Sequence, residues 1–231
     1  MTLQRDWDAW RAKRLADVVL PKGNLALIET RWQQGDREIS PEEALAGLPG
    51  SVTATKTEQK DFNREVIARG IRLWDANSPA IQSFETIDVY PFDPNWIIEA
   101  IYTKHPESRP VAFEHIKDNG GTRDLVVPGE ITLKLDGIDF VLSAFDDGDK
   151  LLLVFADTTN GIETYSSGRF LFVYPTAGTD RIILNFNHAF VPPCGFSIHY
   201  NCPLPPPQNR LHIPIRAGER YPVFRDGYKV S

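Results

Sequence analysis

The chain has 231 residues, 42% of them hydrophobic, and a formal net charge of −6. This negative charge disfavours binding to nucleic acid, which needs a basic surface to displace counterions. No run approaches the ~18 apolar residues of a membrane-spanning helix, and only two cysteines occur. We therefore expect a soluble, cytoplasmic protein with no nucleic-acid or membrane partner.

The N-terminal third is predicted to be helical. Residues 6–18 place Trp7 and Trp10 on one helical face. Ser40-Pro41-Glu42-Glu43 has the residues of a capping box with proline in the first turn, which predicts a short second helix. Residues 56–76 carry apolar side chains at near-helical spacing and predict a third helix, although Gly70 weakens it.

From residue 80 onward, short apolar runs alternate with turn residues. Strands are expected at 84–90, 96–104, 111–117, 131–135, 138–145, 151–156, 169–174 and 181–186, with a turn at 118–121. Asp136-Gly137 is a strong two-residue hairpin signal. Because no strand–helix–strand alternation appears, a parallel sheet is disfavoured.

These patterns predict an α+β protein that is mainly β: an antiparallel β-barrel or sandwich preceded by a helical N-terminal third. We expect residues 1–79 to form a helical segment packed on an antiparallel β domain of residues 80–231.

Unusual sequence tracts follow one another along the β half. They are Phe155 to Tyr165, Gly168 to Phe170, Asn185 to Asn187, Pro192 to Cys194, Cys202 to Pro207, Asn209 to Leu211 and Ala217 to Glu219. Together they resemble the bacterial and archaeal family known as domain of unknown function 1684, over about residues 80–220. The resemblance indicates a fold group and implies no particular activity.

A polar loop between two expected strands is the first candidate site. It holds Asp157, Glu163, Tyr165 and Arg169. Arg169 could bind a carboxylate or phosphate with two parallel hydrogen bonds, and Glu163 could act as a general base, with Tyr165 beside it. Alternatively, Asp157 caps backbone NH groups of its own loop and Arg169 pairs with Glu163 inside the protein.

The second candidate is the run from Asn185 to Ala217, which is too rich in proline for a helix or an inner strand. Asn187, His188 and Arg210 could contact a ligand there. The structural alternative is that the asparagines and Arg210 satisfy backbone groups of the crossing, with Arg210 tied to carbonyls or to Glu163.

Both cysteines lie in the same run. Cys194 could be a nucleophile near His188 or His199. With Cys202 it could also form a disulfide or, with the two histidines, bind zinc, although the spacing is poor. Packing as small buried side chains is the alternative. We expect no metal and no cofactor.

The sequence thus predicts binding of, or action on, a small polar or anionic ligand at a cleft between residues 157–169 and 185–217. Whether the protein is an enzyme stays open. One alternative is a non-catalytic structural or protein-interaction module, and a second is a thiol or metal site at Cys194 and Cys202.

Overall fold

The computed structural model describes residues 2–33, 38–60, 65–117 and 122–230. They divide into two compact units. The first unit comprises Met1–Asp8, Ile87–Pro192 and Cys202–Tyr221, and the second comprises Ala9–Thr86, Pro193–Asn201 and Pro222–Ser231. Packing of residues 1–79 on the β domain stays a prediction.

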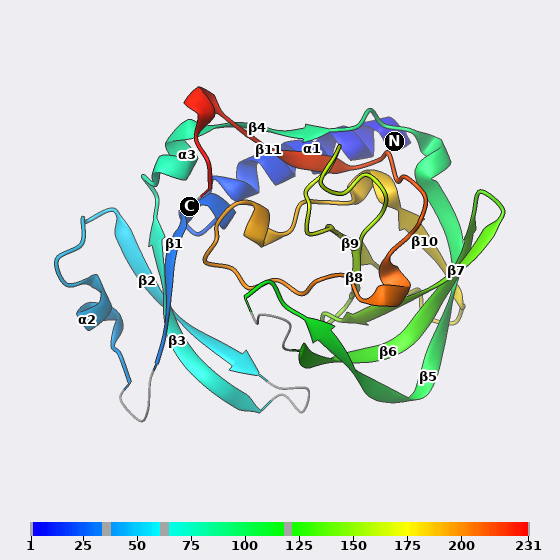
Figure 1. The fold of residues 1–231 in the computed structure, drawn as a ribbon, viewed down its shortest axis with the longest axis horizontal. Helices are drawn as coiled ribbons and strands as arrows, with labels where there is room; N and C mark the ends of the chain where they lie inside the picture. The colour runs from blue at the N-terminus through cyan, green and yellow to red at the C-terminus, as the bar shows by residue number, and fades with distance from the viewer. Residues whose placement is uncertain (1, 34–37, 61–64, 118–121, 231) are drawn as a thin grey trace. The chain divides into compact units, whose positions relative to one another are not determined.

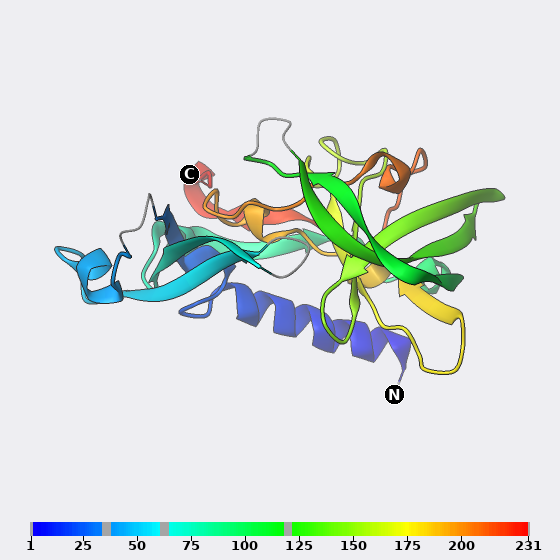
Figure 2. The same ribbon diagram turned by 90° about the horizontal axis from the view of Figure 1, so that it is seen from below.

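An antiparallel sheet dominates the first unit. Among the described residues its six strands follow the order β10-β5-β6-β7-β8-β9. Their bounds are β5 Ile97–Glu114, β6 Thr122–Leu135, β7 Ile138–Asp146, β8 Leu151–Phe155, β9 Arg169–Val173 and β10 Arg181–Asn185. The sheet curls into a half-barrel, which Figures 1 and 2 show from two directions. The predicted mainly-β, antiparallel α+β class is therefore confirmed.

The predicted hairpin turn joins β6 to β7. Asp136 and Gly137 have positive φ angles of 50° and 79°, the pair of left-handed conformations that this two-residue turn requires. The separate strand expected at 111–117 is wrong, because β5 runs on to Glu114 with a register shift between Lys104 and Arg109. The turn expected at 118–121 lies outside the described residues.

One face of this sheet carries the core of the first unit. In β6, the buried residues Ile131, Leu133 and Leu135 alternate with the exposed residues Thr132 and Lys134. This period of two is what a strand with one covered face requires. Burial of one such leucine or isoleucine side chain contributes roughly 1.5–3 kcal/mol.

The second unit contains a smaller antiparallel sheet where a third helix was expected. In the described part of this unit, its strands have the order β1-β3-β2, with β1 Leu27–Trp32, β2 Val52–Lys60 and β3 Val66–Asp75. The predicted helix at 56–76 is therefore wrong. Pairing of β3 with both neighbours outweighs the apparent helical spacing, and a Cβ at Gly70 would lie 2.5 Å from the Arg31 carbonyl oxygen.

The first two predicted helices are present, and α3 was not predicted. α1 spans Leu3–Val18, and α2 spans Pro41–Leu45 with Ser40 Oγ accepting a hydrogen bond from Glu43 N at 3.1 Å, as the capping box predicts. α3 spans Pro79–Ser83. None of the helices in the described ranges is long and apolar enough to cross a membrane.

Two further strands, β4 Phe84–Val89 and β11 Glu219–Phe224, pair with each other in the described chain. Short 3-10 turns complete the chain at Asn24–Ala26, Pro94–Trp96, Phe186–His188, Pro193–Gly195, Pro207–Asn209 and Arg225–Gly227.

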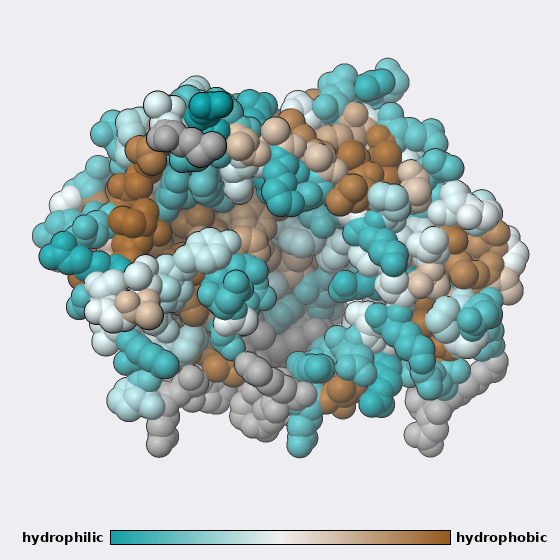
Figure 3. Space-filling model, turned by 180° about the vertical axis from the view of Figure 1, so that it is seen from behind, coloured by the Kyte–Doolittle hydropathy of each residue, from teal (hydrophilic) through white to brown (hydrophobic). Residues whose placement is uncertain are grey.

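Exposed apolar side chains are present in both units. Ile162 is 83% exposed in the first, and Ile67 is 57% exposed in the second. On the face in Figure 3, apolar residues lie in several separate patches between hydrophilic ones. Single exposed apolar side chains are normal on protein surfaces, so Ile162 and Ile67 alone do not indicate a binding site.

Candidate functional site

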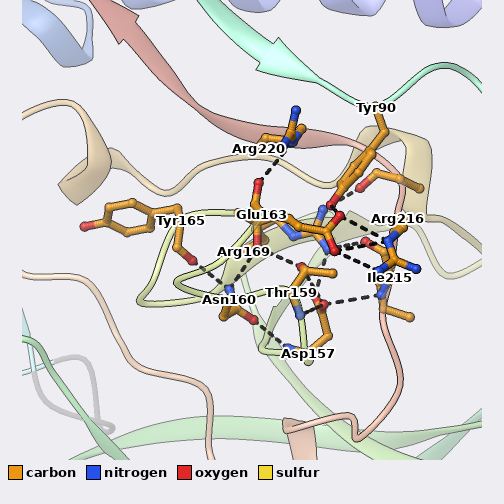
Figure 4. Close-up of polar contacts among 12 residues, drawn as sticks. Tyr90, Asp157, Thr159, Asn160, Glu163, Tyr165, Arg169, Ile215, Arg216 and Arg220 are labelled. Carbon is orange, nitrogen blue, oxygen red and sulfur yellow. Dashed lines mark hydrogen bonds and ion pairs between the residues drawn. The ribbon is translucent and has the colours of Figure 1, made fainter.

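A buried ion pair holds the polar loop in place. Arg169, the first residue of β9, is fully buried and donates from Nη2 to Asp157 Oδ2 at 2.8 Å and to the Ile215 carbonyl at 2.6 Å. Its Nη1 donates to the Ala217 carbonyl. Asp157 Oδ1 in turn accepts from the backbone and the hydroxyl of Thr159, at 2.8 and 2.6 Å (Figure 4). These contacts favour the structural alternative for both charged groups.

The carboxylate partner of Arg169 differs from the one that the structural alternative named. Arg169 was expected to pair with Glu163, and its carboxylate partner is instead Asp157. A glycine brings the chain into this position: Gly168 has a φ angle of 96°, and a Cβ there would lie 2.6 Å from the Phe155 carbonyl oxygen. The buried guanidinium satisfies loop carbonyls that no strand partner reaches.

Glu163 is at the surface of the same loop. Arg216 donates two hydrogen bonds to its carboxylate, from Nη2 to Oε1 at 2.8 Å and from Nε to Oε2 at 3.0 Å. The Tyr90 hydroxyl also donates to Oε2, at 2.9 Å. The Arg216 hydrogen bonds, followed by the Tyr90 hydrogen bond, lower the pKa of Glu163 to about 2. A carboxylate with so low a pKa is a weak base near neutral pH, which disfavours the expected general-base role.

Tyr90 and Arg220 complete this surface cluster. Burial, followed by the hydrogen bond to Glu163, raises the pKa of Tyr90 to about 12. The Arg220 guanidinium lies 5.2 Å from the Tyr90 ring centre and 5.3 Å from that of Tyr221, and donates to Asp88 Oδ2 at 2.7 Å. Sequence reasoning missed all of these partners. The one available signal was the Arg-rich stretch Arg216 to Tyr221 at the end of the resemblance.

Two predicted residues do not join this cluster. The Tyr165 side chain points away from Glu163 (Figure 4), and its backbone NH donates to the Arg220 carbonyl at 2.8 Å. Arg210 is exposed, and its expected tie to Glu163 is wrong, because Arg216 makes that contact.

Asn187 is fully buried, and its side chain forms hydrogen bonds with backbone groups, as the structural alternative for the run from Asn185 to Ala217 predicted. Its side chain accepts from Asp93 N at 3.0 Å and donates to the Asp93 carbonyl at 2.9 Å. Next to it, His188 is partly buried, and this burial lowers the pKa of its imidazole.

Asn209 links β7 and β8 at a point where the two strands no longer form hydrogen bonds with each other. β7 and β8 pair only at Phe145–Leu152 and Asp146–Leu151 in the described residues. Farther along, the Asn209 side chain accepts from Ser143 N at 2.9 Å and donates to the carbonyls of Ser143 and Val154, both at 2.7 Å. The amide thus replaces the missing ladder hydrogen bonds.

The two cysteines belong to different units. Cys194 lies in the second unit and Cys202 in the first, and both thiols are buried. Among the described residues, no three His, Cys, Asp or Glu side chains gather in a group that could hold a metal ion. The thiol or metal alternative gains no support from this geometry.

A cavity opens at one end of the curled sheet. It has a volume of about 670 Å³ and lies where β7 turns into β8 and β9 leads into β10. Its lining consists of Tyr102, Lys104, Pro128, Asp146, Gly148, Asp149, Lys150, Leu151 and residues 175–180. We call it the mouth cavity, and sequence reasoning did not identify it.

The mouth cavity has one aromatic wall. A Cβ at Gly129 would lie 2.7 Å from Cε2 of the Tyr102 ring and 2.5 Å from the Thr103 carbonyl oxygen, so glycine lets the ring pack on the backbone of β6. Burial, with a smaller contribution from Asp146, raises the pKa of Tyr102. Its hydroxyl is therefore protonated at neutral pH and can donate a hydrogen bond.

The match to a family model agrees with the sequence resemblance. The family described as "Protein of unknown function (DUF1684)" matches residues 82–220. An uncharacterized protein of Haloarcula marismortui, solved by solution NMR, is 32% identical; the similarity covers 59% of this chain and 77% of that chain, with a TM-score of 0.49. No curated protein matches. Because the family match covers more than half of the sequence, the chain belongs to the DUF1684 family.

Proposed function

We propose that the protein binds a small polar molecule in the mouth cavity. The observation that carries this proposal is a hollow of about 670 Å³ ringed by five charged side chains and one tyrosine, within the segment that the family match covers. Its volume is within the range of about 300–1,000 Å³ typical of ligand sites, and mouths of β-barrels are a common place for them.

The charges of the lining narrow the class of ligand. Among its described residues, Lys104 and Lys150 face Asp146, Asp149 and Asp180, so two positive charges oppose three negative ones. Such a lining favours a neutral or zwitterionic ligand with several hydrogen-bonding groups over a phosphate ester. The sequence predicted a small polar or anionic ligand, and the proposal keeps the polar ligand and departs from the anionic one.

The proposed place also differs from the expected cleft between residues 157–169 and 185–217. Direct hydrogen bonds join these two segments: Arg169 donates to the Ile215 carbonyl, and the Thr158 NH donates to the Ile213 carbonyl at 3.4 Å. A ligand there would have to displace buried hydrogen bonds, each of which costs about 1–3 kcal/mol when left unsatisfied.

We propose binding rather than catalysis. The described lining of the mouth cavity contains aspartates, lysines and one tyrosine but no histidine, cysteine or serine, so it does not offer the Ser–His or Cys–His pair of nucleophilic catalysis. The net charge of −6 supports a partner other than nucleic acid, and the low cysteine content supports our proposal of a cytoplasmic location.

The test is an NMR titration of the full chain with neutral sugars, zwitterionic amino acids and phosphate monoesters as probes. We expect a saturable change at Tyr102, Lys150 and Thr179 from a sugar or an amino acid. The variant Ala177→Trp, which fills the mouth cavity, should abolish this change. Its matched control is Thr132→Trp, which adds the same side chain at an exposed position of β6.

Two results would contradict the proposal. One is the absence of any saturable change at the cavity lining across the whole panel. The other is a change at the lining that persists in Ala177→Trp while that variant keeps the wild-type melting temperature.

The second candidate is a non-catalytic structural or protein-interaction module. The full burial of Arg169 and Asn187 favours it, because both side chains are used to hold backbone segments together. This candidate predicts that substitution of Arg169 or Asn187 causes a large loss of stability and that neither side chain contacts a ligand.

A further inference from the structure

A second, smaller cavity lies within the second unit. Its volume is about 360 Å³, at the lower end of the range for ligand sites. Its apolar walls come from three parts of the chain: Leu25 and Leu27 near β1, Pro79 and Ala80 in α3, and Phe196. All of these segments belong to one unit, so the cavity is built by that unit alone.

Two buried serines hold the walls of this cavity in place. Ser78 Oγ donates to the Leu25 carbonyl at 2.7 Å and accepts from Ile81 N at 3.2 Å. Ser197 Oγ donates to the Leu27 carbonyl, also at 2.7 Å. Because each hydroxyl proton is already given to a backbone carbonyl, neither serine can donate to a ligand. The serines therefore join the walls of the cavity to one another and leave the recognition of a ligand to other groups.

The remaining polar side chains of the lining are His199 and Tyr228. His199 is close to Glu29, whose pKa is lowered first by its hydrogen bond to Arg31 and, to a smaller extent, by His199 itself. Glu29 is therefore a carboxylate at neutral pH. Because Arg31 holds this carboxylate with two hydrogen bonds of 2.8 Å, the charges of the pair largely cancel, and neither attracts a charged ligand to the cavity.

The C-terminal segment forms the last wall. Tyr228 and Val230 line the cavity, and the segment ends beside the start of β1, as the C label in Figure 1 shows. Tyr228 is itself held against Phe224, with ring centres 5.2 Å apart. Residues 222–230 thus cover a hollow made by segments that are distant in sequence.

We propose that this cavity is a binding site for a small, neutral molecule that carries both an apolar ring and a hydrogen-bonding group, such as a phenol. The apolar walls would bury its ring or chain, with a gain of roughly 25 cal/mol per Å² of apolar surface. Its polar group would face Tyr228 and His199. The site is separate from the mouth cavity and does not depend on the function proposed above.

The test uses the full chain and two probes of nearly equal shape, the neutral p-cresol and the anionic 4-methylbenzoate. In NMR titrations, p-cresol should give saturable changes at Leu25, Phe196 and His199. We expect its Kd to be at least tenfold lower than that of 4-methylbenzoate. Equal or tighter binding of the carboxylate would overturn the assigned ligand class.

Paired variants in α3 test the location. Ala80→Leu fills the cavity and should weaken p-cresol binding at least tenfold, whereas Gln82→Leu places the same side chain at an exposed position of the same helix and should change Kd less than twofold. If Ala80→Leu fails to fold, a chain ending at Gly227 removes the C-terminal wall and should lose p-cresol binding. Unchanged binding in the folded variant, or saturable changes confined to other residues, would overturn the proposal.

Discussion

Removing the Arg169 guanidinium should destabilise the protein strongly. In Arg169→Ala, the Asp157 carboxylate would stay buried without its cation, and the carbonyls of Ile215 and Ala217 would lose their donor. Breaking a fully buried pair in this way costs about 3–5 kcal/mol, out of a total stability of roughly 5–15 kcal/mol. For a chain of this length, the melting temperature should fall by roughly 6–20 °C.

The assay is urea unfolding followed by circular dichroism, with thermal melts alongside. The matched control is Arg210→Ala, which removes the same charge from an exposed position and should change the free energy of unfolding by less than about 0.5 kcal/mol. The double variant Asp157→Ala, Arg169→Ala should be less destabilised than the sum of the two single variants, because neither buried charge is then left alone.

The reasoning fails if Arg169→Ala unfolds within about 1 kcal/mol of the wild type. In that case the buried pair would contribute little to the fold. If the same variant also lost binding of a polar ligand, the sequence expectation that Arg169 binds the ligand would be the better explanation.

Two other predictions concern neighbouring polar groups. The pKa of Glu163 is about 2 in the folded chain, whereas its ordinary value, expected in the unfolded chain, is 4.5. The ionised carboxylate therefore adds stability that is fully present above pH 4.5 and is lost as the pH falls through 2. The stability difference between wild type and Glu163→Gln should therefore shrink across that interval in urea titrations, and a difference that stays constant would contradict this. Asn209→Ala removes three hydrogen bonds to Ser143 and Val154 and should lower the free energy of unfolding by about 2–3 kcal/mol. A loss below about 0.5 kcal/mol would show that water replaces the amide.

Local features of the fold were predicted from sequence because their causes are local. Asp136 and Gly137 adopt the positive φ angles that a tight hairpin needs, and the Ser40 hydroxyl caps the helix that begins one residue later. Each depends only on residues within a few positions. The third helix was wrong because β3 pairs with β1 through residues 70–74, a contact with a distant segment that no local pattern contains.

The candidate site shows the same division. The sequence identified Asp157, Glu163 and Arg169 as a dense polar group, but not the partners of each one. Arg169 is tied to carbonyls 46 and 48 positions away, and Glu163 to an arginine 53 positions away. Desolvation and partner choice set the charge state and the role of each group, and both depend on which distant segments cross.

The sequence by itself therefore determined the antiparallel, mainly-β class and the DUF1684 membership, because strand alternation, turn residues and family motifs are written along the chain. The tertiary structure alone decided which polar residues are buried and which hollows are lined by charge. Both cavities are formed by segments far apart in sequence, and only the packing of those segments brings their side chains together.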